Sequence, residues 1–359
     1  MKRLIVLLVG LLVLAWAGLA LLAQERTAPQ VAIPDDALVV LDNPQFSQPV
    51  GWQWQRLSVG SSEVRWGFAS PDAPQAVVLF LHGYSAPIEI YYESLTRLMN
   101  AGFAVAAMDW PGQGGSSRGS ASAQKIHATT LDGHVDAARA VSAEVRQQFS
   151  DLPMLLSGLS LGAHLGTRLL ATEPGLYQAA ALVTPAYDLY PGRPSDAEKA
   201  LIGLLDAVGF GERYLPGQTD FVFDLDAHNG VASDCSHPNE RTKLWYASML
   251  RDPTIRVGSM SNAFMLAMIE SGRTAQANQS IDAIDIPVWM PLAENDWFVD
   301  NAVSSDVCQR LAQCKSIQYP EARHCLFEEA DAYYEPFIAD WITFLQTAIG
   351  VTSSAALSE

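Results

Sequence analysis

Short runs of consecutive apolar residues alternate with longer stretches of mixed polarity over most of the chain. The runs at residues 76–81, 103–108 and 179–183 are apolar at every position, which is typical of strands buried on both faces of a sheet. Between them, residues 91–100 and 130–149 have the pattern expected of helices. This alternation predicts an α/β fold, in which helices cover both faces of a mostly parallel sheet.

The same pattern extends the sheet at both ends. Residues 52–57 and 64–69, which flank a turn at Gly60, predict an antiparallel hairpin. Late in the chain the alternation resumes, and the expected elements are a strand at 288–292, a helix at 303–311, a strand near 316–319 and a closing helix. We expect the closing helix to begin near Pro336, because proline is favoured in the first turn of a helix.

Residues 187–284 interrupt this alternation. They are rich in polar and turn residues and contain several helical runs, but no strong buried strand. Because strands resume afterwards, we interpret this block as a mainly helical cap (lid) inserted between two strands of one sheet. The sheet and its helices then comprise residues 49–186 and 285–350, and residues 24–48, rich in Pro, Gln and Asp, are expected to be a linker.

The first 23 residues differ from the rest of the chain. Lys2 and Arg3 precede an uncharged run over residues 4–23, which is long enough to cross a bilayer as a helix. A cleaved signal peptide usually has an apolar core of about 7–15 residues, so an uncleaved signal-anchor is favoured, and a cleaved signal remains the alternative. Both interpretations place residues 24–359 outside the cytoplasm, because the basic end stays inside.

Charge and cysteine content narrow the function classes further. The formal net charge of −17 argues against nucleic acid as a partner. Four cysteines in an exported protein suggest disulfides, and no C-x-x-C spacing indicates a metal site. Cys308 and Cys314 are close together and bracket the end of a predicted helix, which favours their pairing and leaves Cys235 to pair with Cys325.

A Gly-x-Ser-x-Gly pattern places Ser160 between a predicted strand and a predicted helix, flanked by Gly158 and Gly162. This is the nucleophile-elbow pattern, in which a sharp turn raises a serine hydroxyl above the sheet. Glycines fit both flanks because a Cβ there would collide with neighbouring backbone. A Gly-x-Ser-x-Gly pattern also occurs by chance in unrelated proteins, so the interpretation depends on partner residues elsewhere in the chain.

A serine nucleophile needs a base to take its proton and an acid to orient that base. In the elbow arrangement the chain order is serine, acid, histidine, with the last two on loops after later strands. Asp296 and His324 each follow one of the two late strands, so we predict Ser160, Asp296 and His324 as the catalytic residues. Glu294 and Asp300 are the alternatives for the acid.

A third signal is His82-Gly83 at the end of the apolar run 76–81. A strand that ends in His-Gly is where this architecture places one of its two oxyanion donors. We therefore predict that the backbone N–H groups of Tyr84 and Leu161 form the oxyanion hole. His82 itself is expected to brace the loop rather than to carry a proton.

Taken together, these segments resemble the α/β-hydrolase superfamily, and within it the branch of monoacylglycerol lipases and bacterial lysophospholipases. The resemblance rests on LFLHGYS, the Asp-x-x-Gly-x-Gly-x-Ser form of residues 109–116, SGLSLGAH, LAENDWFVD and ARHCLFEE. Residues 233–246 loosely resemble the cap segment of lysophospholipase L2-like proteins. The resemblance implies a cap over the site and no cofactor.

The sequence therefore predicts a membrane-tethered or exported serine hydrolase that acts on lipid-like carboxylic esters, such as monoacylglycerol or a lysophospholipid. An aminopeptidase or another acyl hydrolase on the same scaffold is the alternative enzyme, although no acidic cluster in the cap stands out as a site for a free amine. A non-catalytic binding protein is the third hypothesis, and the complete Ser-Asp-His set argues against it.

Overall fold

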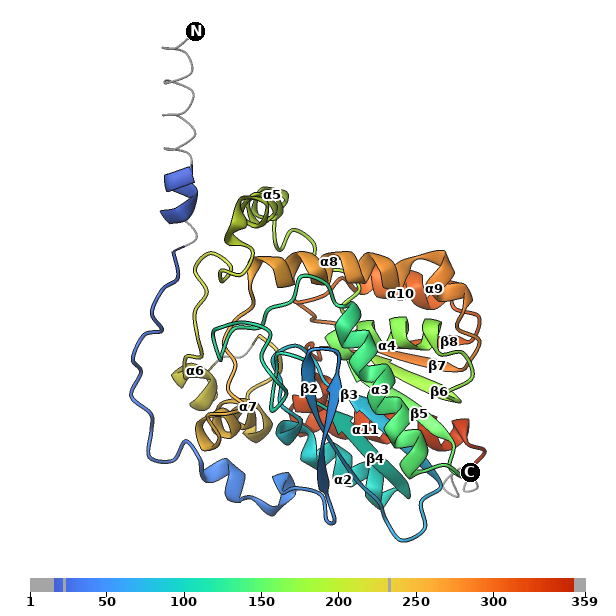
Figure 1. Cartoon of the computed structure of the whole chain (residues 1–359). Helices are drawn as coiled ribbons and strands as arrows, with labels where there is room; N and C mark the ends of the chain where they lie inside the picture. The colour runs from blue at the N-terminus through green and yellow to red at the C-terminus, as the bar shows by residue number, and fades with distance from the viewer. Residues whose placement is uncertain (1–15, 22–23, 232–233, 352–359) are drawn as a thin grey trace, which may run out of the picture.

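One mixed sheet of eight strands organises residues 16–21, 24–231 and 234–351, which the computed structural model describes (Figure 1). The strand order is β1-β2-β4-β3-β5-β6-β7-β8. The strands are β1 (Gln53–Val59), β2 (Ser62–Ala69), β3 (Ala76–Leu81), β4 (Phe103–Met108), β5 (Met154–Leu159), β6 (Ala179–Val183), β7 (Val288–Ala293) and β8 (Cys314–Tyr319). From β4 to β8 all neighbours are parallel, and the β1–β2 hairpin adds the antiparallel edge.

The central strands are buried at every position, as their uniformly apolar sequences predict. β3, β4 and β6 have the expected bounds, and no residue of these strands is exposed to solvent. Alternate side chains of β3 enter two separate cores: Leu79 and Leu81 pack on one face of the sheet, and Val78 and Phe80 on the other. The predicted α/β class is therefore confirmed.

Helices cover both faces of this sheet. Those outside the cap are α2 (Tyr92–Asn100), α3 (Asp132–Gln148), α4 (Leu161–Thr172), α10 (Asn301–Arg310) and α11 (Asp331–Ala348), with short 3-10 turns η3 (Ile88–Tyr91) and η5 (Leu326–Glu328). The apolar sides of α3, α4 and α10 belong to one core, and those of α2 and α11 to the other. The two layers hold the sheet rigid, and the carboxyl ends of its strands carry the site described below.

The cap lies between β6 and β7, as the break in the sequence pattern predicted. Its elements are α5 (Asp196–Leu205), the π-helical turn η4 (Asp206–Phe210), α6 (Leu225–His228), α7 (Glu240–Arg251), α8 (Asn262–Gln276) and α9 (Asn278–Asp282). α8 packs on α4, the helix that follows the elbow, and the side chains of Phe264 and Met268 are buried in the same core as α4. In Figure 1, α8 runs along the top of the view and α7 lies at the lower left.

Residues 24–48 run along the cap and end beside α2 (Figure 1). Glu25 forms an ion pair with Lys125, and Asp36 Oδ1 lies 3.1 Å from Nε2 of His228 in α6. The 3-10 turns η1 (Val39–Asp42) and η2 (Pro44–Phe46) follow, and the side chains of Val40 and Phe46 are buried. Most of the predicted membrane segment lies outside the described residues, and none of the described helices is long and apolar enough to cross a membrane.

The closing helix differs from its prediction. α11 begins at Asp331, so Pro336 lies inside the helix. The earlier turn is held by Arg241 of the cap, whose guanidinium donates to Asp331 at 2.8 Å and lies 3.7 Å above the ring of Tyr334. Proline removes the hydrogen bond to the carbonyl of Ala332, but Ala332 is exposed, so water can satisfy that carbonyl.

Candidate active site

The turn between β5 and α4 has the geometry of a nucleophile elbow. Ser160 has a φ of 53°, a left-handed conformation that is unusual for a residue with a side chain. A Cβ on Gly158 would lie 2.6 Å from the backbone of Gly162, and a Cβ on Gly162 would lie 2.0 Å from the carbonyl oxygen of Leu81. Only glycine at both flanks lets the strand and the helix approach this closely.

The structure brings Ser160, His324 and Asp296 into one chain of hydrogen bonds. Ser160 Oγ lies 2.8 Å from His324 Nε2, and His324 Nδ1 lies 2.6 Å from Asp296 Oδ2. In the tautomer whose Nδ1–H donates to Asp296, Nε2 is left to accept a proton from the serine hydroxyl. His324 and Asp296 are 4 % and 5 % exposed, so water does not screen their interaction.

Asp296 is oriented by the loop in which it lies. Its Oδ1 accepts from the amides of Phe298, at 2.8 Å, and Val299, at 3.0 Å, which leaves Oδ2 for the histidine. The two alternative acids have other partners: Glu294 accepts from the amide of Glu321, and Asp300 caps α10.

The loop after β3 lies against the elbow. A Cβ on Gly83 would be only 3.6 Å from the Cβ of Ser160, so Tyr84 follows at the side of the nucleophile. Gln113 accepts from the amide of Ser85 at 2.6 Å and fixes the far end of this loop. Leu161 is the first residue of α4, where unpaired amides and the helix dipole favour negative charge. The loop that carries Tyr84 therefore lies beside Ser160, and Leu161 follows Ser160 in the chain.

Two other histidines close to these loops have different environments. His82 is fully buried and bonds with Gly83 and Trp110, which fits the bracing role expected of it. Burial lowers its pKa below the ordinary value. His164, one turn along α4, meets Ser271 of the cap at 2.7 Å, and burial lowers its pKa to about 3. Neither is placed to take a proton from Ser160.

The Asp-x-x-Gly-x-Gly-x-Ser motif forms a buried ionic anchor beside the site. Asp109 accepts from Arg65 Nε at 2.5 Å and from the amide of Gly115 at 2.8 Å. Arg65 also donates two hydrogen bonds to Glu89. Burial disfavours the charged guanidinium, yet the two carboxylates outweigh it and raise the pKa of Arg65 above its ordinary value. The motif itself was the sequence signal for Asp109, but nothing in it identified Arg65.

The cap is fastened to the loop that carries His324. The predicted disulfide between Cys235 and Cys325 is present, as is that between Cys308 and Cys314. Glu329 also accepts from the backbone N–H of His237 at 2.9 Å. These contacts make the histidine loop and residues 235–241 of the cap one structural unit.

A second contact between the cap and the core joins α7 to α2. Arg241 of α7 forms two hydrogen bonds with Glu93 of α2, at 2.6 and 2.9 Å, and both residues are buried. Sequence reasoning missed this pair, because Arg241 and Glu93 lie far apart in the chain and no motif links them.

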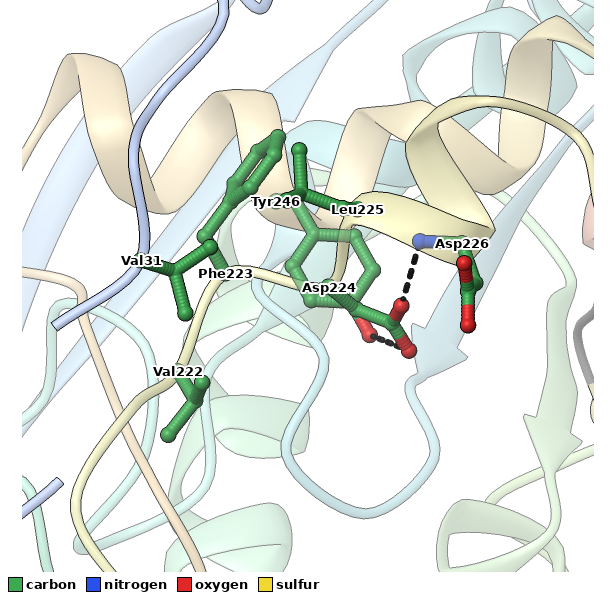
Figure 2. A pocket seen from close by; sticks show the side chains of 7 residues that line it. All are labelled: Val31, Val222, Phe223, Asp224, Leu225, Asp226 and Tyr246. Carbon is green, nitrogen blue, oxygen red and sulfur yellow. Dashed lines mark hydrogen bonds between the residues drawn. The ribbon is translucent and has the colours of Figure 1, made fainter. Parts of the chain in front are cut away.

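A hollow of about 500 Å³ between the N-terminal segment and the cap does not include Ser160, Asp296 or His324 (Figure 2). Its lining residues are Val31, Val222, Phe223, Asp224, Leu225, Asp226 and Tyr246. Asp224 already accepts from the first amides of α6 and from the hydroxyl of Tyr246, so its carboxylate is occupied. This hollow therefore offers no chemistry that competes with the Ser160 site.

The fold and the site define an α/β-hydrolase of the esterase and lipase group. The family described as serine aminopeptidase, S33 (Hydrolase_4) matches residues 72–331, and the chain belongs to this family. That match includes the whole cap and the core from β3 to the start of α11.

Relatives with assigned names fall within the same group. The monoacylglycerol lipase of Mycolicibacterium smegmatis is 24 % identical over 283 residues, which cover 76 % of this chain and 90 % of that protein. Lysophospholipase L2 of Escherichia coli is 25 % identical over 219 residues, which cover 61 % of this chain and 63 % of that protein.

Solved structures share the architecture at lower identity. A soluble variant of the monoglyceride lipase of Saccharomyces cerevisiae superposes with a TM-score of 0.65 at 16 % identity, over 84 % of this chain and 97 % of that one. A thermostable carboxyl esterase of Bacillus coagulans gives a TM-score of 0.63 at 16 % identity, over 84 % and 99 % of the two chains. At these identities the likeness is one of fold.

Proposed function

We propose that the chain is a serine hydrolase that cleaves carboxylic esters of lipid-like molecules, such as monoacylglycerols or lysophospholipids, through an acyl-enzyme. The observation that carries this proposal is the unbroken chain of hydrogen bonds from Ser160 through His324 to Asp296. A serine hydroxyl becomes nucleophilic when a neutral imidazole accepts its proton, and the carboxylate stabilises the imidazolium that forms.

In the first half-reaction, Ser160 Oγ attacks the ester carbonyl while His324 Nε2 takes the hydroxyl proton. The carbonyl oxygen becomes an oxyanion between the amides of Tyr84 and Leu161. When the tetrahedral intermediate collapses, the bond from the acyl carbon to the alcohol oxygen breaks. His324 returns the proton to that oxygen, and the alcohol leaves.

In the second half-reaction, water takes the place of the alcohol. His324 removes a proton from the water as its oxygen bonds to the acyl carbon, and the same amides hold the second oxyanion. Collapse breaks the bond to Ser160 Oγ, which recovers its proton from His324. The carboxylic acid leaves, and no cofactor is consumed.

Apolar side chains at the mouth of the site support a lipid-like substrate. Trp297 and Phe298 follow Asp296 directly and are 49 % and 43 % exposed, and the ring of Phe298 lies 5.2 Å from that of His324. Between the loop after β3 and the cap, the ring of Tyr84 lies 6.0 Å from that of the buried Phe264. An acyl chain that lay against Trp297 and Phe298 would bury apolar surface beside the reacting carbonyl.

A substrate panel tests this proposal. Purified residues 24–359 are expected to release fatty acid from monoacylglycerols and lysophospholipids, and p-nitrophenol from p-nitrophenyl esters. Aminoacyl p-nitroanilides in the same panel test the aminopeptidase alternative, which the description of the family keeps open. Turnover of the anilides without turnover of the esters would contradict the proposal.

We further propose that the protein works outside the cytoplasm, tethered through residues 1–23 or released from them. The two disulfides support an oxidising compartment. A C-terminal reporter that is active only outside the cytoplasm tests the orientation, and a silent reporter would contradict it.

A further inference from the structure

Glu328 is a buried carboxyl group that the proposed mechanism does not use. It lies four residues after His324, at the end of η5, and is only 9 % exposed. The turn folds it back beneath the histidine loop, because its amide donates to the carbonyl of Cys325 at 2.8 Å. The cap closes over its backbone, where Asn239 donates to the Glu328 carbonyl at 2.9 Å.

The Glu328 side chain contacts Tyr91, which belongs to the segment that follows β3 and lies beside Ser160. The hydroxyl of Tyr91, at the end of η3, lies 3.4 Å from Glu328 Oε1. The same hydroxyl faces the amide of Gly83. Tyr91 is held in place by a tilted contact with the ring of Phe80 and an edge contact with that of Phe327. Glu328 and Tyr91 thus join the loop that carries His324 to the loop that carries Tyr84.

Two charged groups of the histidine loop, His324 and Glu329, and the hydroxyl of Tyr91 act on Glu328. Burial raises the pKa of the Glu328 carboxyl to about 7, and the hydrogen bond from Tyr91 and the charge of a protonated His324 offset only part of that effect. The neighbouring Glu329 carboxylate acts in the same direction as burial. A carboxyl group in this environment ionises in the same pH range in which a histidine side chain gains or loses its proton.

We infer that Glu328, paired with Tyr91, is a positioning residue that acts through His324: an ionised Glu328 adds a second negative charge to that of Asp296 while His324 holds the proton of Ser160. This inference rests on the proposed function. The imidazolium exists in both tetrahedral intermediates, so a buried carboxylate whose charge acts on it stabilises them more than it stabilises the resting enzyme. Tyr91 favours the ionised carboxylate by donating to it.

The test compares Glu328→Gln with the parent protein and with Glu335→Gln, an exposed residue of α11 that pairs with Arg97. Steady-state hydrolysis of p-nitrophenyl butyrate is followed from pH 5.5 to 9, and protonation of His324 is followed by NMR of its ring nitrogens. We expect Glu328→Gln to lower kcat at pH 8 about tenfold with KM almost unchanged. We also expect both pH midpoints to move to lower pH by about one unit, because the imidazolium of His324 loses a negative charge that stabilises it.

Tyr91→Phe provides a second variant that keeps the carboxyl group. Without its donor, the carboxyl group should ionise at higher pH, so activity should fall more at pH 7 than at pH 9. Tyr177→Phe is the control: it removes a buried tyrosine hydroxyl that contacts Ser142, and it should leave the pH profile of activity unchanged.

The outcomes separate the inference from the proposed function. Unchanged pH profiles and an unchanged His324 titration in Glu328→Gln would overturn the inference. If that variant fails to fold, equal losses at pH 7 and pH 9 in Tyr91→Phe would overturn it. A parent protein that hydrolyses no ester would overturn the proposed function instead, and the NMR titration would still decide the role of Glu328.

Discussion

Cys325, the residue after His324, is joined to Cys235 of the cap twice. The two residues share a disulfide, and the amide of Cys325 donates to the carbonyl of Cys235 at 2.7 Å. The position of the proposed catalytic base therefore depends on a segment 90 residues earlier in the chain. The cap and the triad are expected to respond together when this connection is cut.

The variant Cys235→Ala/Cys325→Ala should lose both stability and activity. Opening a loop that spans 90 residues should lower the free energy of unfolding by about 4 kcal/mol in the chain-entropy description. Loosening of His324 should lower kcat/KM about tenfold or more. Denaturant titration and ester hydrolysis check the two effects.

Cys308→Ala/Cys314→Ala is the matched control, since it removes a disulfide from α10 and β8 that spans only six residues. It should cost about 2 kcal/mol and leave kcat/KM unchanged. Equal effects of the two double variants on kcat/KM would contradict a specific link between Cys325 and the site.

Gly162→Ala should lower activity strongly. The added Cβ would lie 2.0 Å from the carbonyl oxygen of Leu81, and backbone cannot move aside as a flexible side chain can. The elbow must then open, which displaces Ser160 from His324 and should lower kcat/KM by about a hundredfold or more. Gly203→Ala in α5 is the control, because its Cβ meets nothing within 4 Å and should stabilise the helix by about 0.5–1 kcal/mol. Parent-like activity of Gly162→Ala would disprove the steric explanation.

Asp109→Asn should destabilise the fold strongly. The change leaves the buried guanidinium of Arg65 without one of its two carboxylate partners, a loss that costs about 3 kcal/mol or more at buried pairs. Glu63→Gln breaks the exposed pair between Arg56 and Glu63, where about 0–1 kcal/mol is expected. Urea midpoints of the two variants measure the contrast, and similar midpoints would argue against a buried anchor at Asp109.

Glu328 should make stability depend on pH in a defined window. Its pKa is about 7 in the folded protein and about 4.5 in the unfolded chain, so between these values only the folded state keeps the proton. The free energy of unfolding should therefore fall as pH rises from 4.5 to 7, by up to about 3 kcal/mol from this group. Glu328→Gln removes this loss.

Melting temperatures of the parent protein and Glu328→Gln, measured at intervals from pH 4 to 8, check this expectation. The melting temperature of the variant should rise relative to that of the parent across the window. A difference that stays constant with pH would show that Glu328 ionises in the folded protein as it does in the unfolded chain.

The sequence predicted the core of the fold well because its signals are local. Strands β3, β4 and β6 are uniformly apolar, and their bounds could be taken from the sequence alone. The start of α11 was misplaced, because Pro336 was taken as the proline of the first turn, whereas the helix begins earlier, at Asp331, which Arg241 of the cap contacts.

The candidate site divides in the same way. Ser160, Asp296 and His324 could be predicted from one motif, the order of residues along the chain and the ends of two strands. Glu328 and Arg65 could not, because their roles depend on burial and on partners distant in the sequence. A glutamate after a histidine gives no sign that it will be buried against a tyrosine of another loop.

The most direct test of the proposed function is the release of fatty acid from a long-chain monoacylglycerol by the parent protein and by Ser160→Ala, measured side by side. The account predicts turnover by the parent protein and a loss of about 10⁴-fold or more in the variant, because the members of a triad act as a unit. Circular dichroism should show that the variant is folded. Substantial monoacylglycerol hydrolysis by folded Ser160→Ala would contradict the central claim.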